Sequence, residues 1–163
     1  MTVYDERGCL MEITDKLDEE EVPYKVSTHR PAFTAQEVAQ EEHVRGMNVA
    51  KCVVVTADGR DYLCVLSACC MIDFDALKSA LAASEVHLAS EAHVAELFED
   101  CEVGAEPPFG SFYGLPTLMD DRMEREDFIM FQGGRHDRAI QMDMQTYLRI
   151  ERPRVFSFSS RLH

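Results

Sequence analysis

The sequence has no uninterrupted apolar run of the roughly 18–20 residues that a membrane-spanning helix requires. Residues 1–17 include acidic side chains where a secretory signal would have a basic start and an apolar segment. These two absences argue against export and membrane insertion, and they predict a cytoplasmic protein. The length of 163 residues suits one domain, which we expect to span residues 1–163.

The signature motifs of several enzyme classes are also missing. There is no G-x-S-x-G for a serine nucleophile, no H-E-x-x-H for zinc, and no P-loop or G-x-G-x-x-G for a nucleotide. The six cysteines form no C-x-x-C pair, and no cluster of histidine and cysteine has zinc-finger spacing. We therefore expect no metal and no cofactor, and thiols that stay buried and reduced in a reducing compartment.

Basic residues are scarce, and the formal net charge at pH 7 is −14. Such a charge argues against a nucleic-acid partner, because contacts to phosphate dominate that affinity. The distribution is uneven, since residues 133–163 hold six arginines and three acidic residues, a net of +3. One interpretation is a local basic surface on an acidic body, and the other is a solvated C-terminus of mixed charge. The arginines are Arg135, Arg138, Arg149, Arg152, Arg154 and Arg161.

Periodicity and breaker residues predict helices and strands that mix without a regular βαβ repeat, which favours an α+β fold. The clearest element is a hairpin, in which a β-branched run over 49–56 and a second strand over 61–67 flank an Asp58-Gly59 turn. Further strands are predicted over 24–27, 128–131, 138–142 and 155–158, and helices over 5–21, 73–82, 90–98 and 143–150.

Two segments near the hairpin stand out. Thr34 and Glu37 form a capping-box pattern, which predicts a helix over 35–42. The segment 102–116 is too rich in glycine and proline to form a helix. Long irregular segments inside a domain are more often functional than accidental, so this segment is a candidate part of a site.

Lys51 is the most unusual residue of the hairpin by its position. Strand alternation gives it Val53 as a neighbour on one apolar face, while Cys52 and Val54 lie on an opposite face that is also apolar. The strand is therefore expected to be central and covered on both sides. A lone cation there needs a partner, an exit to solvent or a cavity. A lysine that reaches water from the strand start and a lysine that serves a pocket are both compatible with this pattern.

Gly133-Gly134-Arg135-His136 follows one predicted strand and precedes another. Two glycines allow a close backbone approach to a ligand and can present N–H groups to an oxyanion. His136 beside them could orient a water molecule or hold a hydroxyl group. A glycine-rich turn with a surface histidine is the structural alternative.

Seven landmarks occur in order between about Leu17 and Phe158. They are His29; Phe33-Thr34 with Glu37; Gly46; Val49-Ala50-Lys51; Cys101-Glu-Val-Gly104 with Pro107-Pro108 and Gly110; Tyr113-Gly114-Leu115-Pro116 with Asp120 or Asp121; and Gly133-Gly134-x-His136. No single motif is diagnostic. In order and spacing the set resembles the YbaK/prolyl-tRNA-synthetase-associated family of free-standing aminoacyl-tRNA deacylases.

This resemblance implies an α+β domain with a bent, barrel-like mixed sheet flanked by helices. It implies a trans-editing hydrolase that cleaves the ester between a wrong amino acid and the 3′ end of tRNA, with an aminoacyl-tRNA synthetase as a second partner. Lys51 matches the lysine most associated with activity, and we expect His136 and Gly134 to be catalytic with it. The expected substrate-binding residues are His29, Thr34, Asn48, Gly104, Pro108 and Gly133.

Two positions depart from the family pattern. Arg30 interrupts the usual His-Pro pair, and Asn48 stands at a variable position three residues before the lysine. Both lie near the expected amino-acid pocket, so they bear on which amino acid is accepted. Selection by pocket volume favours small residues such as alanine, serine or threonine.

The residues permit a mechanism without a covalent nucleophile. A cationic Lys51 would hold a phosphate or the ester carbonyl, and N–H groups around Gly104 or Gly133-Gly134 would stabilise the oxyanion. A water molecule placed by His136 would attack the ester. Two alternatives are a non-catalytic module that binds an aminoacyl or nucleotide group, and an esterase or thioesterase for small molecules, which would not show the salt dependence of tRNA binding.

Overall fold

The computed structural model describes residues 12–162. The helices are α1 (Ile13–Glu19), α2 (Ala35–Glu42), α3 (Phe74–Ala80), α4 (Glu91–Leu97), α5 (Asp121–Glu124) and α6 (Met144–Glu151), with the 3-10 helices η1 (Gly46–Asn48) and η2 (Gly110–Tyr113). The strands are β1 (Lys25–Thr28), β2 (Ala50–Ala57), β3 (Arg60–Ser67), β4 (Cys70–Ile72), β5 (Val86–Leu88), β6 (Thr117–Asp120), β7 (Phe128–Gln132), β8 (Arg138–Asp143), β9 (Arg154–Phe156) and β10 (Ser159–Arg161).

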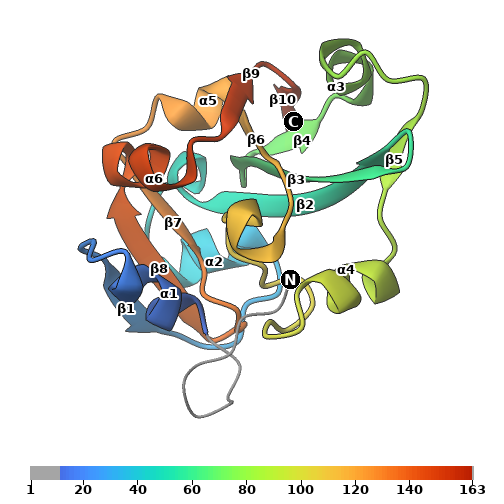
Figure 1. Ribbon diagram of the computed structural model, residues 1–163. Helices are drawn as coiled ribbons and strands as arrows, with labels where there is room; N and C mark the ends of the chain where they lie inside the picture. The colour runs from blue at the N-terminus through green and yellow to red at the C-terminus, as the bar shows by residue number, and fades with distance from the viewer. Residues whose placement is uncertain (1–11, 163) are drawn as a thin grey trace.

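A five-stranded sheet crosses the centre of the molecule in the order β5-β2-β3-β6-β9 (Figure 1). The predicted hairpin forms its middle, with β2 and β3 antiparallel, whereas β3, β6 and β9 pair in parallel. Asp58 and Gly59 both have left-handed backbone angles, with φ of 48° and 82°, as a two-residue type I′ turn requires. The α+β class and the hairpin are confirmed.

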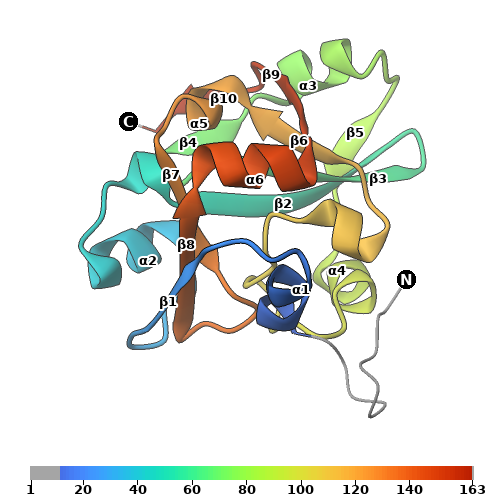
Figure 2. The same ribbon diagram turned by 60° about the vertical axis from the view of Figure 1, so that its left-hand side comes forward.

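Both faces of the central sheet are covered, as the apolar faces of β2 predict. Ala50 and Val54 belong to the largest apolar cluster, together with Tyr147 of α6. On the other face, Val55 packs in a separate cluster with Leu77 of α3. Figure 2 shows α6 lying across β2 on the first of these faces. A charged side chain in β2 therefore meets mostly apolar surroundings.

Two smaller sheets flank the central one. One has the order β1-β8-β7, and the other pairs β10 with β4. β7 meets β2 through an isolated parallel bridge between Val49 and Met130, and β5 occupies the same edge of β2 from Val55 onward. The expected barrel-like sheet is thus divided into three sheets, and the strands of residues 12–162 form no closed barrel, because β7 leaves β2 after one bridge.

Helix caps explain where three predicted helices begin. The Thr34 hydroxyl accepts a hydrogen bond from the Glu37 N–H at 3.1 Å, and Asp73 and Ser90 cap α3 and α4 in the same way. The helix predicted over 5–21 ends at Glu19 in the structure. The structure begins this helix at Ile13, and the predicted residues 5–11 lie outside the described part of the chain.

Candidate active site

Lys51 occupies the second position of β2 and is half-buried. Its ammonium group donates a hydrogen bond to the backbone carbonyl of Cys70. Because an ammonium group carries three N–H donors, two remain for a ligand. Burial lowers the pKa of Lys51 below the usual value for lysine. The lone cation in the central strand therefore has a neutral partner, which does not cancel its charge.

A cavity of about 200 Å³ adjoins Lys51. Its lining comes from four parts of the chain: Phe33, Thr34 and Ala35 at the start of α2, Ala50–Cys52 in β2, Gly104 and Glu106 in the irregular segment, and Gln132 at the end of β7. A second, more apolar cavity of about 240 Å³ shares Cys52, Gly104 and Glu106 with it. The two cavities thus meet at β2 and the irregular segment.

Cys52 presents its backbone at an unpaired part of the edge of β2. Val54 accepts a hydrogen bond from the Ala89 N–H on the side away from β3, at 3.0 Å. The backbone groups of alternate strand residues point to the same side, so those of Cys52 also face away from β3. Strand pairing on this side is interrupted between the Val49–Met130 bridge and the residues that meet β5. Cys52 can therefore offer an N–H and a C=O to a molecule in either cavity.

Glu106 places a buried carboxyl group where the two cavities meet. Only 7% of the residue is exposed, and its Oε1 accepts the Gly104 N–H at 2.9 Å. Burial raises the pKa of Glu106, although the hydrogen bond from Gly104 opposes this. No Lys or Arg lies within ion-pair distance of it among residues 12–162. Its charged form therefore lacks a strong cationic partner.

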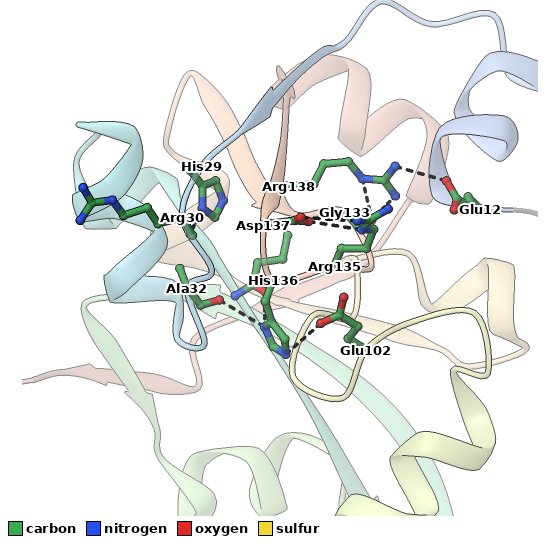
Figure 3. Close-up of polar contacts among 11 residues, drawn as sticks. Glu12, His29, Arg30, Ala32, Glu102, Gly133, Arg135, His136, Asp137 and Arg138 are labelled. Carbon is green, nitrogen blue, oxygen red and sulfur yellow. Dashed lines mark hydrogen bonds and ion pairs between the residues drawn. The ribbon is translucent and has the colours of Figure 1, made fainter.

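His136 joins the irregular segment to the rest of the site (Figure 3). Its Nδ1 lies 3.0 Å from Gln132 Oε1 and 3.2 Å from the Ala32 carbonyl. Its Nε2 lies 2.9 Å from the Val103 carbonyl and 3.9 Å from a carboxylate oxygen of Glu102. Both ring nitrogens thus contact protein oxygens. This arrangement suits a residue that positions the irregular segment rather than one that orients a water molecule.

Gly104 fits this loop because its backbone is in the left-handed region, with φ of 93°. A Cβ at this position would also lie 3.3 Å from Cε1 of His136. The loop, the histidine ring and the Glu106 carboxyl group therefore form one packed unit beside Lys51.

The glycine pair forms a tight turn whose N–H groups are already used. Gly133 donates to the Arg138 carbonyl and Gly134 to the Ala105 carbonyl, each at 3.0 Å. The Arg138 guanidinium in turn donates to the Gly133 carbonyl (Figure 3). Neither N–H is available to an oxyanion in this structure, so the turn fits the structural alternative.

Four expected substrate-binding residues do not line the cavity beside Lys51: Gly133, whose turn is described above, and three others. His29 has a side chain that is 4% exposed, with its Nε2 3.7 Å from Glu42 in α2. Asn48 donates a hydrogen bond to the Phe128 carbonyl at 3.1 Å. The carbonyl of Pro108 accepts a tyrosine hydroxyl from α6. These residues stabilise the walls around the site.

Two thiols packed against the largest apolar cluster, those of Cys52 and Cys101, are not activated. Burial raises the pKa of Cys52 and of Cys101 above the usual value for a thiol. The thiolate is the reactive form, so these cysteines are poor nucleophiles. All five cysteines within residues 12–162 are free, and no group of three metal-ligating side chains occurs there.

The fold is shared with solved structures. The crystal structure of a hypothetical protein matches with a TM-score of 0.83 at 18% identity, over 92% of this chain and all of that one. The crystal structure of a candidate trans-editing enzyme for prolyl tRNA synthetase matches with a TM-score of 0.75 at 20% identity, over 84% of this chain and 87% of that one. The architecture is thus that of a known α+β fold.

Residues 29–150 match the model of the aminoacyl-tRNA editing domain, and the chain belongs to this family. The Multifunctional Ser/Thr-tRNA deacylase ProXp-y of Escherichia coli (strain K12) is 32% identical in an alignment 151 residues long, which covers 87% of this chain and 87% of that one. ProXp-y of Escherichia coli O157:H7 matches to the same extent. The prediction of a trans-editing aminoacyl-tRNA deacylase is confirmed, and aminoacyl-tRNA is the implied substrate. None of the helices within residues 12–162 is long and apolar enough to cross a membrane.

Proposed function

We propose that the cavity beside Lys51 binds the aminoacyl ester at the 3′ end of mischarged tRNA and that the enzyme hydrolyses it with a water molecule. The observation that carries this proposal is a half-buried ammonium group on the wall of a small cavity, with a single hydrogen bond within residues 12–162. Lys51 donates to the ester carbonyl or to the terminal phosphate, and both gain from a nearby positive charge.

The backbone N–H of Cys52 is the second donor to the developing oxyanion. It faces the unpaired edge of β2, and Cys52 lines the cavity next to Lys51. We assign this role to Cys52 in place of Gly133 and Gly134, whose N–H groups bind protein carbonyls. One such donor contributes about 3–4 kcal/mol to the stability of the transition state.

Glu106 recognises the α-ammonium group of the aminoacyl ester. Its carboxyl group is buried next to both cavities and is hydrogen-bonded to Gly104. A buried carboxylate gains from a cationic ligand, and the free amino acid ester supplies one. His136 acts on this group indirectly, because it packs against Gly104 and fixes the loop.

The substrate amino acid is small, and we favour serine and threonine over alanine. A cavity of about 200 Å³ lies below the range of roughly 300–1,000 Å³ that is typical of ligand pockets. Thr34, Glu106 and Gln132 line it, so a hydroxyl group would find polar neighbours. The relative ProXp-y is a Ser/Thr-tRNA deacylase, which agrees with this choice.

A panel assay tests the proposed function. The purified protein is incubated with tRNA charged in turn with serine, threonine, alanine, cysteine or phenylalanine, and the loss of each ester is timed against buffer. We expect the seryl and threonyl esters to disappear fastest and the phenylalanyl ester to survive, because it exceeds the cavity. Equal rates for all five esters, or no acceleration over buffer, would contradict the proposal.

The proposed function also includes a partner, a cellular compartment and a domain organisation. A synthetase partner would deliver mischarged tRNA, and the free thiols suit the reducing cytoplasm in which tRNA is charged. A single domain over residues 1–163 is sufficient for the proposed chemistry, because every assigned group lies within the matched residues 29–150.

A further inference from the structure

A groove lined by four arginines lies outside the candidate active site. Arg45 precedes η1, Arg122 and Arg125 lie at α5, and Arg161 ends β10. The groove has a volume of about 410 Å³. In both ribbon views α5, β10 and β4 lie side by side at one end of the molecule (Figures 1 and 2). A quarter of the 16 lysines and arginines thus gather in one place on a chain of net charge −14.

Acidic residues neutralise only half of this charge. Arg45 pairs with Glu126 at 3.2 Å and Arg125 pairs with Asp121 at 3.4 Å. Arg122 and Arg161 have no carboxylate within 4 Å among residues 12–162. The paired arginines keep 73% and 71% of their side chains exposed. The groove therefore offers accessible guanidinium groups and a local surplus of positive charge.

The groove is connected to Lys51 through one pair of strands. Arg161 pairs with Cys70 across β10 and β4. The carbonyl of the same Cys70 accepts the hydrogen bond from the Lys51 ammonium group. Directly paired residues of antiparallel strands lie about 5 Å apart. Lys51 and Arg161 thus both adjoin Cys70, and this residue of β4 links the cavity beside Lys51 to the groove.

We propose that this arginine groove binds the phosphates of the tRNA strand that ends in the aminoacyl ester. The inference rests on the proposed function, since the strand must leave the cavity beside Lys51. Each nucleotide of that strand carries a phosphate, and guanidinium groups bind phosphate with two parallel hydrogen bonds. The groove allows an acidic protein to bind RNA, because its guanidinium groups attract the phosphates at close range even though the net charge of the protein is negative.

The test compares two double variants of the full chain. Arg122→Ser with Arg161→Ser removes the two unpaired guanidinium groups of the groove. Arg60→Ser with Arg149→Ser is the matched control, because Arg60 lies at the turn of the β2–β3 hairpin and Arg149 on α6, and neither lines the groove. The binding of uncharged tRNA is measured for each protein over a range of salt concentrations, with the melting temperature as a check on folding.

We expect the groove variant to bind tRNA more weakly, while the control binds like the unaltered protein. The slope of log affinity against log salt should fall by about 1.4 in magnitude, since each phosphate contact on a single strand contributes roughly 0.7. An unchanged slope, or an equal fall in the control, would overturn the proposal. An unchanged tRNA affinity would also be the result if the groove served an acidic protein partner instead.

Hydrolysis separates this inference from the proposed function. Seryl-tRNA and seryl-adenosine carry the same ester, but the adenosine ester has no phosphate. The groove variant should raise KM for seryl-tRNA and leave the hydrolysis of seryl-adenosine unchanged, and an equal loss on both would overturn the proposal. If the unaltered protein hydrolyses neither ester, the proposed function fails, and the salt dependence of tRNA binding still decides the role of the groove.

Discussion

The proposed function depends on one side chain, the ammonium group of Lys51. A cation inside a doubly covered sheet is costly unless it has polar contacts. Lys51 meets this requirement with the Cys70 carbonyl and with a cavity, rather than with a carboxylate. A carboxylate partner would have cancelled the positive charge, whereas a carbonyl leaves it available. The same contacts that stabilise the side chain therefore prepare it to bind an ester or a phosphate.

Glu106 gives a prediction at this scale. Burial raises its pKa in the folded protein, so the unfolded chain ionises first as the pH rises, and the free energy of unfolding falls as the pH increases through this window. Glu106→Gln cannot ionise and keeps an oxygen for the Gly104 N–H. We expect the variant to gain stability relative to the unaltered protein as the pH rises above the ordinary pKa of glutamate, measured by urea unfolding.

The same variant also tests recognition of the substrate amino group. It should hydrolyse seryl-tRNA more slowly, yet N-acetylseryl-tRNA, which has no cationic amine, should react equally with both proteins. A stability difference that stays constant as the pH rises above the ordinary pKa of glutamate would argue against a raised pKa. An equal loss on both esters would argue against contact with the amine.

Three residues singled out from the sequence lie together in the structure. Lys51, Thr34 and Gly104 line one cavity, because an odd lysine in an apolar strand and a helix cap are local signals. Glu106 was missed, since a glutamate in a loop resembles a solvated residue until the fold buries it. The sequence also suggested that the Gly134 N–H is free for an oxyanion, whereas in the structure it donates to the Ala105 carbonyl. Which carbonyl an N–H meets depends on tertiary contacts that the sequence does not display.

At the scale of elements, the site results from a gap between strands. β7 meets β2 at Val49 and β5 meets it from Val55, and the backbone of Cys52 is exposed between them. The irregular segment closes one side of the gap and the start of α2 another. An open strand edge inside a protein is a ready place for a ligand, because its N–H and C=O groups need partners.

Thr34 serves both the stability of the fold and the site, because it caps α2 and lines the cavity. Thr34→Ala removes the acceptor of the Glu37 N–H and should lower the free energy of unfolding by about 1 kcal/mol. Thr34→Ser keeps the hydroxyl and is the matched control, with stability close to that of the unaltered protein. Urea unfolding of the three proteins provides the measurement. If Thr34→Ala and Thr34→Ser lose equal free energy of unfolding, the hydroxyl cap is not the source of the stabilisation.

The longer elements were predicted, and among the short strands β1 and β9 were predicted whereas β4, β5, β6 and β10 were not. The hairpin, α2 and α6 carry clear alternation, turn or cap signals, and they fall within about one residue of their predicted bounds. β4, β5 and β10 have three residues each, which is too short for any periodicity to be visible. These strands exist because the central sheet and its neighbours offer them partners.

At the scale of the whole molecule, charge along the chain did not predict charge on the surface. Of the two interpretations of the C-terminal arginines, dispersed mixed charge fits better than one basic surface: Arg138 binds Gly133, and Arg135 pairs with Asp137. Only Arg161 joins the groove, whose other arginines come from earlier in the chain. Folding brings together basic residues that are far apart in sequence. A strongly acidic composition is therefore compatible with an RNA substrate, provided that the positive groups are local.

The most direct test of the central claim is the rate of seryl-tRNA hydrolysis by Lys51→Met, measured in single turnover beside Lys78→Met, which removes an exposed lysine of α3 as the control. We predict that Lys51→Met loses activity by about 10²–10³-fold, as expected for the loss of one oxyanion donor, while its melting temperature stays at or above that of the unaltered protein. The control should keep full activity. A folded Lys51→Met variant that clears seryl-tRNA at the original rate would contradict the account.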